Sequence, residues 1–300
     1  MTWRLCCLRR AEILANHTSF RIGGPAELFA DPGGVEELAG LLKTAHHSGT
    51  PVSIIGGGTN CLVPDRGIRG LVIRLGRAFR SIELIGEGER SPLPQALVRC
   101  GASVWTQRLV SWGGRYGWGN VEALAGLPGQ VGGAIVGNAQ NIGQFVSRLT
   151  VVSFEGDVKE LTREQLEFAY RYTAIEPGII TDVVFEFPQI SPDESAERIR
   201  RALSYRNTTQ ELRLPSAGCA FKNPPGQPAG RLIDQAGLKG ARLGDAQVSR
   251  RHANFIVNVG QATCDDVLSL MEHIQRRVAR QFGVWLDPEI RLLGERWKNE

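Results

Sequence analysis

The central segment between Gly113 and Gly143 most restricts how this 300-residue chain can fold, because it is unusually rich in glycine for the interior of a protein. Glycine adopts backbone conformations that are closed to other residues and lets the main chain approach another group closely. A glycine-rich stretch of this length inside a compact domain is uncommon and is usually functional. We therefore expect a binding role for it, with the edge of a bulged strand as the structural alternative.

Composition places the chain among ordinary globular proteins, with 42% hydrophobic and 22% charged residues and room for two or three domains. The net charge of +4 is small and spread out, which favours solvated surfaces over a nucleic-acid site. No apolar run is long enough to span a bilayer, and the six cysteines form no Cys-x-x-Cys pair. We expect a cytoplasmic monomer with reduced thiols that binds no nucleic acid, membrane or metal.

Apolar periodicity and turn residues predict three domains, at 1–76, 77–207 and 208–300. The expected strands are 52–55, 71–75, 81–85, 96–100, 149–154, 179–187, 219–222 and 255–259. The expected helices are 35–46, 103–112, 163–168, 192–207, 229–236 and 264–282. Ser191 and Thr263 are placed to cap the helices that follow them, and Asp266 lies three residues after Thr263.

The first candidate site is the run Gly56, Gly57, Gly58, Thr59 and Asn60, which directly follows a predicted strand. Successive glycines let backbone N–H groups converge on an anion, and the last two residues add side-chain donors. The run is neither a Walker loop nor a dinucleotide-binding fingerprint. A tight turn is the alternative.

The second candidate site lies in the glycine-rich centre. Its residues are Pro128, Gly129, Val131, Gly132, Gly133, Ala134 and Asn138. Two glycine clusters flank the proline, so this backbone can lie flat against a planar ring system and offer it hydrogen-bond donors.

Three shorter motifs contribute reactive or charged side chains. Arg171 stands between Tyr170 and Tyr172, where a guanidinium can offer two parallel N–H groups to a carboxylate. The alternative is a surface arginine stacked on tyrosine.

Cys219 lies among small residues and is followed by Lys222 and Asn223, and Glu289 comes near the C-terminus. The alternatives are a small buried residue for Cys219 and a solvated carboxylate for Glu289.

Taken together and in this order, these motifs resemble the UDP-N-acetylenolpyruvoylglucosamine reductase (MurB) family. The resemblance extends from Asn16 to Glu295 and includes the segments at Gly56, Ala125, Tyr170, Ser216, 247–258 and Pro288. The short stretch between Arg171 and the third domain indicates the shorter subclass of this family.

The resemblance implies an α+β protein in which domains 1–76 and 77–207 form an FAD-binding unit like that of vanillyl-alcohol oxidases. It places the FAD pyrophosphate on the run that starts at Gly56 and the isoalloxazine near Pro128–Ala134. Domain 208–300 would bind the UDP-sugar substrate. The implied substrate contacts are Tyr170, Lys222, Asn223, Lys239 and His252.

The implied activity is the NADPH-dependent reduction of UDP-N-acetylglucosamine enolpyruvate to UDP-N-acetylmuramate, a step of peptidoglycan synthesis. Arg171 would stabilise the charge that develops on the substrate carboxylate, and a protonated Glu289 would donate a hydrogen bond to it. Cys219 would protonate the second carbon.

Two departures from the family pattern stand out. The family usually has serine at Cys219, and it typically reads Asn-Ala-Gly-Ala-Tyr-Gly where this chain has Gln140 and Ile142 between Asn138 and Gly143. Two other functions remain open: another FAD-linked oxidoreductase of the same superfamily, and a non-catalytic nucleotide-sugar-binding relative.

Overall fold

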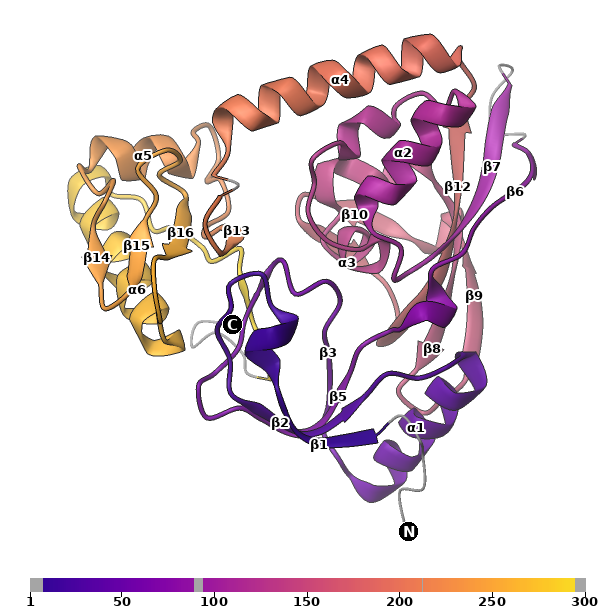
Figure 1. Ribbon diagram of the computed structural model, residues 1–300, viewed down its shortest axis with the longest axis horizontal. Coiled ribbons are helices and arrows are strands. Elements are labelled where there is room, and N and C mark those ends of the chain that lie inside the picture. The colour runs from indigo at the N-terminus through magenta and orange to yellow at the C-terminus, as the bar shows by residue number, and fades with distance from the viewer. Residues whose placement is uncertain (1–7, 89–93, 212, 295–300) are drawn as a thin grey trace. The chain divides into compact units, whose positions relative to one another are not determined.

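The computed structural model describes residues 8–88, 94–211 and 213–294 (Figure 1). The chain forms two compact units. The first contains Met1–Leu8, Ala30–Gly57 and Ile73–Arg206, and the second contains Arg9–Phe29, Gly58–Val72 and Asn207–Glu300. The division into three domains stays a prediction.

A five-stranded antiparallel sheet forms the centre of the first unit, in the order β6-β7-β12-β8-β9. Its strands are β6 (Ile82–Glu87), β7 (Gln95–Gly101), β8 (Val146–Ser153), β9 (Val158–Thr162) and β12 (Gly178–Pro188). The central strand β12 is buried on both faces, because the adjacent Val184 and Phe185 are both inaccessible to solvent. Val183 pairs with Cys100 on one side and with Leu149 on the other.

Short helices and a hairpin complete the first unit. The helices are α1 (Val35–Ser48), α2 (Thr106–Tyr116) and α3 (Val131–Val136), and the hairpin consists of β10 (Glu167–Ala169) and β11 (Tyr172–Ala174). The short strand β3 (Val52–Ile54) follows α1. Helices α2 and α3 lie on the same side of the five-stranded sheet (Figure 1). Helix α2 ends at Gly117, whose φ of 70° is the left-handed conformation that commonly terminates helices.

The second unit is built around the sheet β13-β16-β15-β14. Its strands are β13 (Ser216–Cys219), β14 (Arg242–Leu243), β15 (Ala246–Val248) and β16 (Phe255–Asn258), and its helices are α5 (Ala229–Gln235) and α6 (Cys264–Phe282). Phe20, Ile22 and Leu62 join the core that these elements form. The core therefore draws on three separate parts of the chain.

Short strands extend the second unit beyond this sheet. Strands β1 (Leu8–Ile13), β2 (Pro25–Ala30) and β5 (Ile68–Ile73) lie in that order in one sheet. Strands β4 (Cys61–Leu62) and β17 (Arg291–Leu292) form a parallel pair, in which Arg291 is opposite Cys61. The C-terminal segment is thereby fixed beside the residues that follow the glycine run.

Both predicted helix caps are confirmed. Thr263 Oγ1 accepts a hydrogen bond from the Asp266 N–H at 3.0 Å, and the Asp266 carboxylate accepts one from the Thr263 N–H at 3.0 Å. Ser191 Oγ accepts a hydrogen bond from the Glu194 N–H at the start of α4 (Pro192–Thr209).

Three predicted elements were wrong in position or type. The strand expected at 219–222 ends at Cys219, because the register shifts after Ser216 and the Lys222 N–H bonds to Asp287 instead. The helix expected from residue 103 starts at Thr106, because the Ser103 hydroxyl bonds to the carbonyl oxygens of residues 76 and 79.

The third wrong prediction is the helix at 163–168. Thr162 and Gln165 close a capping box around the single 3-10 turn Arg163–Gln165. The chain then continues as strand β10. A strong local cap therefore produced one turn, and the hairpin pairing of β10 with β11 prevailed over helix extension.

Candidate functional site

The first half of the glycine run lies against the central glycine-rich segment. A Cβ atom at Gly57 would lie 3.1 Å from the ring of Trp105 and 3.2 Å from the Cα of Gly129, and one at Gly56 would lie 3.5 Å from Gln130 Oε1. The indole of Trp105 is 44% exposed. The two predicted cofactor segments are therefore neighbours within the first unit.

The second half of the run packs on the N-terminal segment of the second unit. Gly58 has a φ of 65°, and a Cβ atom there would clash with the His17 carbonyl oxygen. Within the described part of the chain, no group accepts a hydrogen bond from the backbone N–H of Gly56, Gly57 or Gly58. Three such donors in a row, on residues that carry no side chains of their own, fit an anionic ligand.

Helix α2 holds the loop that precedes α3. The Thr106 hydroxyl donates to the carbonyl oxygens of Leu127 at 2.5 Å and Gly129 at 3.2 Å. Gln107 accepts a hydrogen bond from the Gly126 N–H at 3.1 Å. The side chains of Thr106 and Gln107 therefore fix the backbone of this loop, including its two glycines.

Two glycines of α3 serve different purposes. A Cβ atom at Gly132 would lie 3.0 Å from the Ala102 side chain, so this glycine permits close packing. A Cβ atom at Gly133 would have nothing within 4 Å, and the residue is exposed. Val131 and Ala134, beside them, are buried. Gly133 thus leaves open space on the surface of this helix.

Asn138 connects α3 to the hairpin that carries Arg171. Its Nδ2 donates to the Ala169 carbonyl at 2.9 Å, and its Oδ1 accepts from the Gly143 N–H at 3.0 Å. The Thr173 hydroxyl donates to the Ile135 carbonyl at 2.5 Å. The hairpin is therefore attached to the end of α3.

Arg171 itself occupies the tight turn between β10 and β11, with a φ of 58°. Its guanidinium carbon lies 5.6 Å from the centre of the Tyr170 ring, and Tyr170 is 57% exposed. Arg171 therefore lies beside the predicted flavin segment on a tethered turn.

The departure at residues 140–142 has a conformational consequence. Gln140 and Asn141 have φ values of 54° and 56°, in the left-handed region that favours glycine. Ile142 is fully buried, and a Cβ atom at Gly143 would clash with the Phe168 ring. The turn thus keeps a glycine-like backbone although Gln140 replaces the usual glycine.

The segments that carry Cys219 and Glu289 are hydrogen-bonded to each other. The Glu289 N–H donates to the Ala220 carbonyl at 2.8 Å, and the Lys222 N–H donates to the Asp287 carbonyl at 2.8 Å. Asn60 Nδ2 donates to the Glu289 carbonyl at 3.3 Å. In the second unit, Asn60 and Glu289 therefore lie next to the residues that directly follow Cys219.

Asn223, Lys239 and His252 are arranged around α5. Asn223 Oδ1 accepts a hydrogen bond from the Ala229 N–H at 3.0 Å, and Lys239 Nζ lies 2.7 Å from an Asp234 carboxylate oxygen. The His252 ring lies 3.7 Å from the Cβ position of Gly230. Burial lowers the pKa of His252, and Lys239 lowers it further, whereas a backbone hydrogen bond opposes the shift.

Sequence reasoning missed Ser19 as a site residue. Its hydroxyl donates to the Ser216 carbonyl at 2.6 Å and the Gly58 carbonyl at 3.1 Å. The only available signal was its place in the run from Asn16 to Ala26, because a lone serine has no pattern that predicts partners so far away in sequence.

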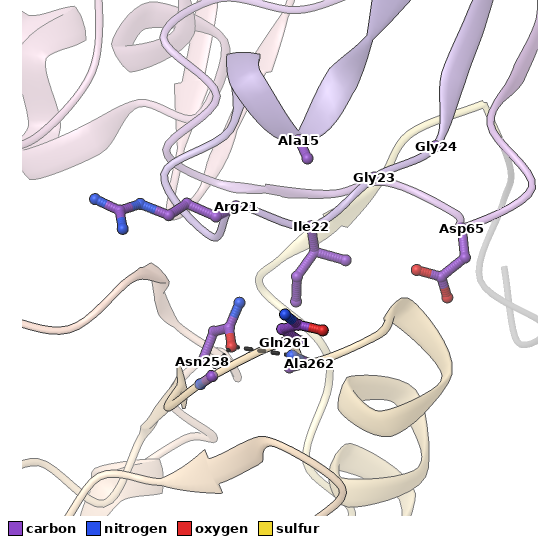
Figure 2. A pocket seen from close by; sticks show the side chains of 10 residues that line it. Ala15, Arg21, Ile22, Gly23, Gly24, Asp65, Asn258, Gln261 and Ala262 are labelled. Atoms are coloured by element: carbon purple, nitrogen blue, oxygen red, sulfur yellow. Dashed lines mark hydrogen bonds between the residues drawn. The ribbon is translucent and has the colours of Figure 1, made fainter.

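The second unit also has a shallow cavity of about 300 Å³ between the segment after β1 and the turn before α6. Figure 2 shows its lining, which includes Ala15, Arg21, Asp65, Asn258 and Gln261. Asn258 Oδ1 closes the turn by accepting from the Ala262 N–H, and the Asp65 carboxylate accepts from the Cys264 N–H. No predicted site residue lines this cavity, and two of its polar side chains, Asn258 and Asp65, hold the turn before α6 and the start of that helix.

The described helices include none long and apolar enough to cross a membrane. In the same residues, no group of three or more His, Cys, Asp or Glu side chains is arranged to hold a metal ion.

A family model described as "FAD binding domain" matches residues 26–162, which include both glycine-rich segments, and this match places the chain in the flavin-binding class. A second model, "UDP-N-acetylenolpyruvoylglucosamine reductase, C-terminal domain", matches residues 210–293. The chain belongs to the UDP-N-acetylenolpyruvoylglucosamine reductase family. This confirms the predicted family, fold class and FAD dependence.

Individual relatives support the same conclusion over nearly the whole chain. UDP-N-acetylenolpyruvoylglucosamine reductase 2 of Symbiobacterium thermophilum is 42% identical, with 96% of this chain and 92% of the relative covered. The Pelobacter propionicus reductase is 40% identical, with 95% of each covered. The crystal structure of the Thermus caldophilus reductase matches with a TM-score of 0.80 and 36% identity, and covers 95% of this chain and 98% of that one.

Proposed function

We propose that this chain reduces UDP-N-acetylglucosamine enolpyruvate to UDP-N-acetylmuramate with NADPH and FAD, in the synthesis of peptidoglycan precursors. The observation that carries the proposal is the close approach of Gly57 to Gly129, in a chain that matches both family models. This approach places the backbone N–H donors of the glycine run next to the glycine-rich segment. A dinucleotide with a planar ring requires both features side by side.

The residues fit FAD in two places. The N–H groups of Gly56–Gly58 would hold the pyrophosphate, with Thr59 and Asn60 beside them. The remaining cofactor contacts would be Pro128, Gly129, Val131, Gly132, Gly133, Ala134 and Asn138. The open space at Gly133 supports this assignment. The chemistry that FAD supplies when bound is hydride transfer between NADPH and the enol ether.

Arg171 would stabilise the reaction on the enolpyruvyl side. An enol ether is electron-rich, so negative charge builds up toward the substrate carboxylate as hydride arrives. A fixed guanidinium beside that carboxylate stabilises the charge most strongly where water is excluded. The attachment of its hairpin to Ile135 and Asn138 supports this role, because it limits reorganisation.

Cys219 would supply the one proton that the reaction needs, and Glu289 would assist at the substrate carboxylate. A protonated Glu289 would donate a hydrogen bond to the substrate carboxylate, and Cys219 would protonate the second carbon. The hydrogen bond between Glu289 and Ala220 supports a shared site, because it places the two segments side by side.

The nucleotide-sugar would contact Tyr170, Lys222, Asn223, Lys239 and His252. Lys222 and Lys239 suit a diphosphate, since an ammonium is a compact point charge. A neutral His252 suits a hydrogen-bonding role, in line with its lowered pKa.

We also propose the domain division 1–76, 77–207 and 208–300, a monomeric state, a cytoplasmic location, and no binding of nucleic acid.

Product analysis tests the proposed function. The purified chain should convert the enolpyruvyl sugar into UDP-N-acetylmuramate while oxidising an equal amount of NADPH. Absence of NADPH oxidation with this substrate would favour the non-catalytic relative.

Acid precipitation tests the other flavin enzymes of the superfamily, which often attach the cofactor covalently. The pellet should be colourless and the flavin should remain in solution. Cys61, the nearest thiol in sequence to the glycine run, is buried in β4, and burial raises its pKa to about 12, which disfavours attachment there.

A further inference from the structure

Ser19 holds two segments of the second unit together with one residue. Its N–H donates to the Gly58 carbonyl at 2.9 Å. Its hydroxyl proton is shared between the Ser216 carbonyl at 2.6 Å and the Gly58 carbonyl at 3.1 Å. The glycine run and the first residue of β13 thus meet at Ser19.

The surroundings of Ser19 are themselves fixed. The Thr18 hydroxyl donates to the Ile22 carbonyl at 3.1 Å, and Asn258 Nδ2 donates to the Phe20 carbonyl at 3.1 Å. Gly58 is in contact with the His17 carbonyl, so a shift of the run moves this segment. A displacement at Gly58 is therefore transmitted to Ser19 rather than absorbed by a loose loop.

Strand β13 carries the effect to Cys219. Ser216 pairs with Val257 and Cys219 with Phe255, but the register shifts between these pairs. The residues on either side of β13 are fixed by other hydrogen bonds, because the Asn258 N–H donates to the Pro215 carbonyl and the Ala220 N–H donates to the Asn254 carbonyl. The bond from Ser19 to Ser216 adds a direct link between the start of β13 and the residue that also holds Gly58.

We propose that Ser19 is a positioning residue that couples occupancy of the Gly56–Asn60 run to the position of β13, and so to Cys219. Anion binding at the run would fix Gly58, Ser19 would transmit this to Ser216, and β13 with Cys219 would be held more firmly in the FAD-loaded protein. The coupling rests on the proposed function, because it assumes FAD at the run and a role for Cys219.

Hydrogen exchange of the peptide that contains Ser216–Cys219, measured with and without FAD, tests the coupling. FAD should slow exchange there about 10-fold in the parent, which corresponds to about 1.4 kcal/mol. In Ser19→Ala the slowing should fall to about 2-fold or less, because the hydroxyl that bonds to both Gly58 and Ser216 is gone. Ser19→Thr, which keeps the hydroxyl, should restore the parent response.

Two further variants complete the design. Ser48→Ala removes a hydroxyl that also donates to two carbonyl oxygens, at the end of α1, and should behave as the parent does. Ser19→Cys keeps the size of the side chain but offers a weak donor, so it should lose the coupling even if Ser19→Ala does not fold. In both Ser19→Ala and Ser19→Cys, flavin reoxidation by substrate should slow about 10-fold, while reduction by NADPH stays unchanged.

The coupling is wrong if FAD slows exchange in β13 equally in Ser19→Ala, Ser19→Cys and the parent. It is also wrong if FAD leaves β13 unaffected in the parent. Failure of the proposed function gives a different result, namely a parent protein that takes up no flavin or shows no NADPH oxidation.

Discussion

Asn60 and Glu289 are joined by a hydrogen bond from the Asn60 side-chain amide to the Glu289 carbonyl oxygen at 3.3 Å, although 229 positions separate them in the sequence. The Arg291 N–H donates back to the Asn60 carbonyl at 3.1 Å. The backbone of Glu289 is therefore held by hydrogen bonds to Asn60 and Ala220. These backbone hydrogen bonds do not depend on which side chain position 289 carries.

We expect Glu289→Gln to retain more activity than Glu289→Ala, because an amide still donates a hydrogen bond to the substrate carboxylate. Loss of one well-placed donor costs about 10²–10³ in rate, which we expect for Glu289→Ala. The measurement is single-turnover reoxidation of reduced flavin by substrate, with Glu272→Ala as an exposed carboxyl control. A slower Glu289→Gln would show that a charged carboxylate is needed.

Gly133→Leu should lower FAD affinity about 10-fold or more without destabilising the apoprotein. Gly133 and Gly40 are both exposed helical glycines whose Cβ positions have nothing within 4 Å, so protein packing tolerates a side chain at either. Leucine favours helix over glycine by about 0.5–1 kcal/mol. Gly40→Leu is the matched control, and both affinities are measured by flavin fluorescence titration.

Unchanged FAD affinity in Gly133→Leu, together with a thermal midpoint no lower than that of the parent, would mean that the flavin does not lie over this helix. Reduced affinity in both variants would indicate a general effect of the substitution.

Arg171→Ala should slow flavin reoxidation by the enolpyruvyl substrate by about 10²–10³ and leave reduction by NADPH nearly unchanged. The guanidinium matters when charge grows on the substrate carboxylate, and NADPH has no such centre. The two half-reactions are measured separately under anaerobic conditions. Arg163→Ala, which removes an arginine stacked on Phe168, is the control; equal slowing of both half-reactions by Arg171→Ala would count against the assignment.

Cys219→Ala should nearly abolish product formation, whereas Cys219→Ser should stay active and become insensitive to alkylation. A thiol is a stronger acid than a serine hydroxyl, but either can donate a proton to the second carbon, whereas the alanine side chain cannot. Turnover at the parent rate in Cys219→Ala would show that water supplies the proton.

Alkylation can be directed to Cys219 with little interference. Burial raises the pKa of Cys61 to about 12, burial and the Asp65 carboxylate together raise that of Cys264 to about 12, and burial also raises the pKa of Cys100. These thiols remain neutral and poorly reactive. Cys6 and Cys7 lie outside the described residues, so the experiment is best done with both replaced by serine.

Local sequence signals predicted the C-terminal helix α6 well. Thr263 and Asp266 form a reciprocal cap whose partners are three residues apart, and the apolar spacing behind them is that of one buried helix face. The strand expected at 52–55, directly before the glycine run, was likewise predicted within one residue of β3.

Long-range pairing could not be predicted in the same way. Ser19 and Ser216 are 197 residues apart, and nothing in either sequence environment selects the other. The left-handed φ of Arg171 could not be predicted either, because arginine rarely adopts this conformation. The pairing of Ala169 with Tyr172 imposes the turn. Tertiary contacts decide both features.

The most direct test of the account follows the visible flavin absorbance during sequential anaerobic mixing. We predict that NADPH bleaches the bound flavin and that UDP-N-acetylglucosamine enolpyruvate restores its absorbance, with one UDP-N-acetylmuramate formed per flavin reoxidised. Flavin that is bleached by NADPH but reoxidised only by oxygen, and not by the enolpyruvyl sugar, would contradict the account.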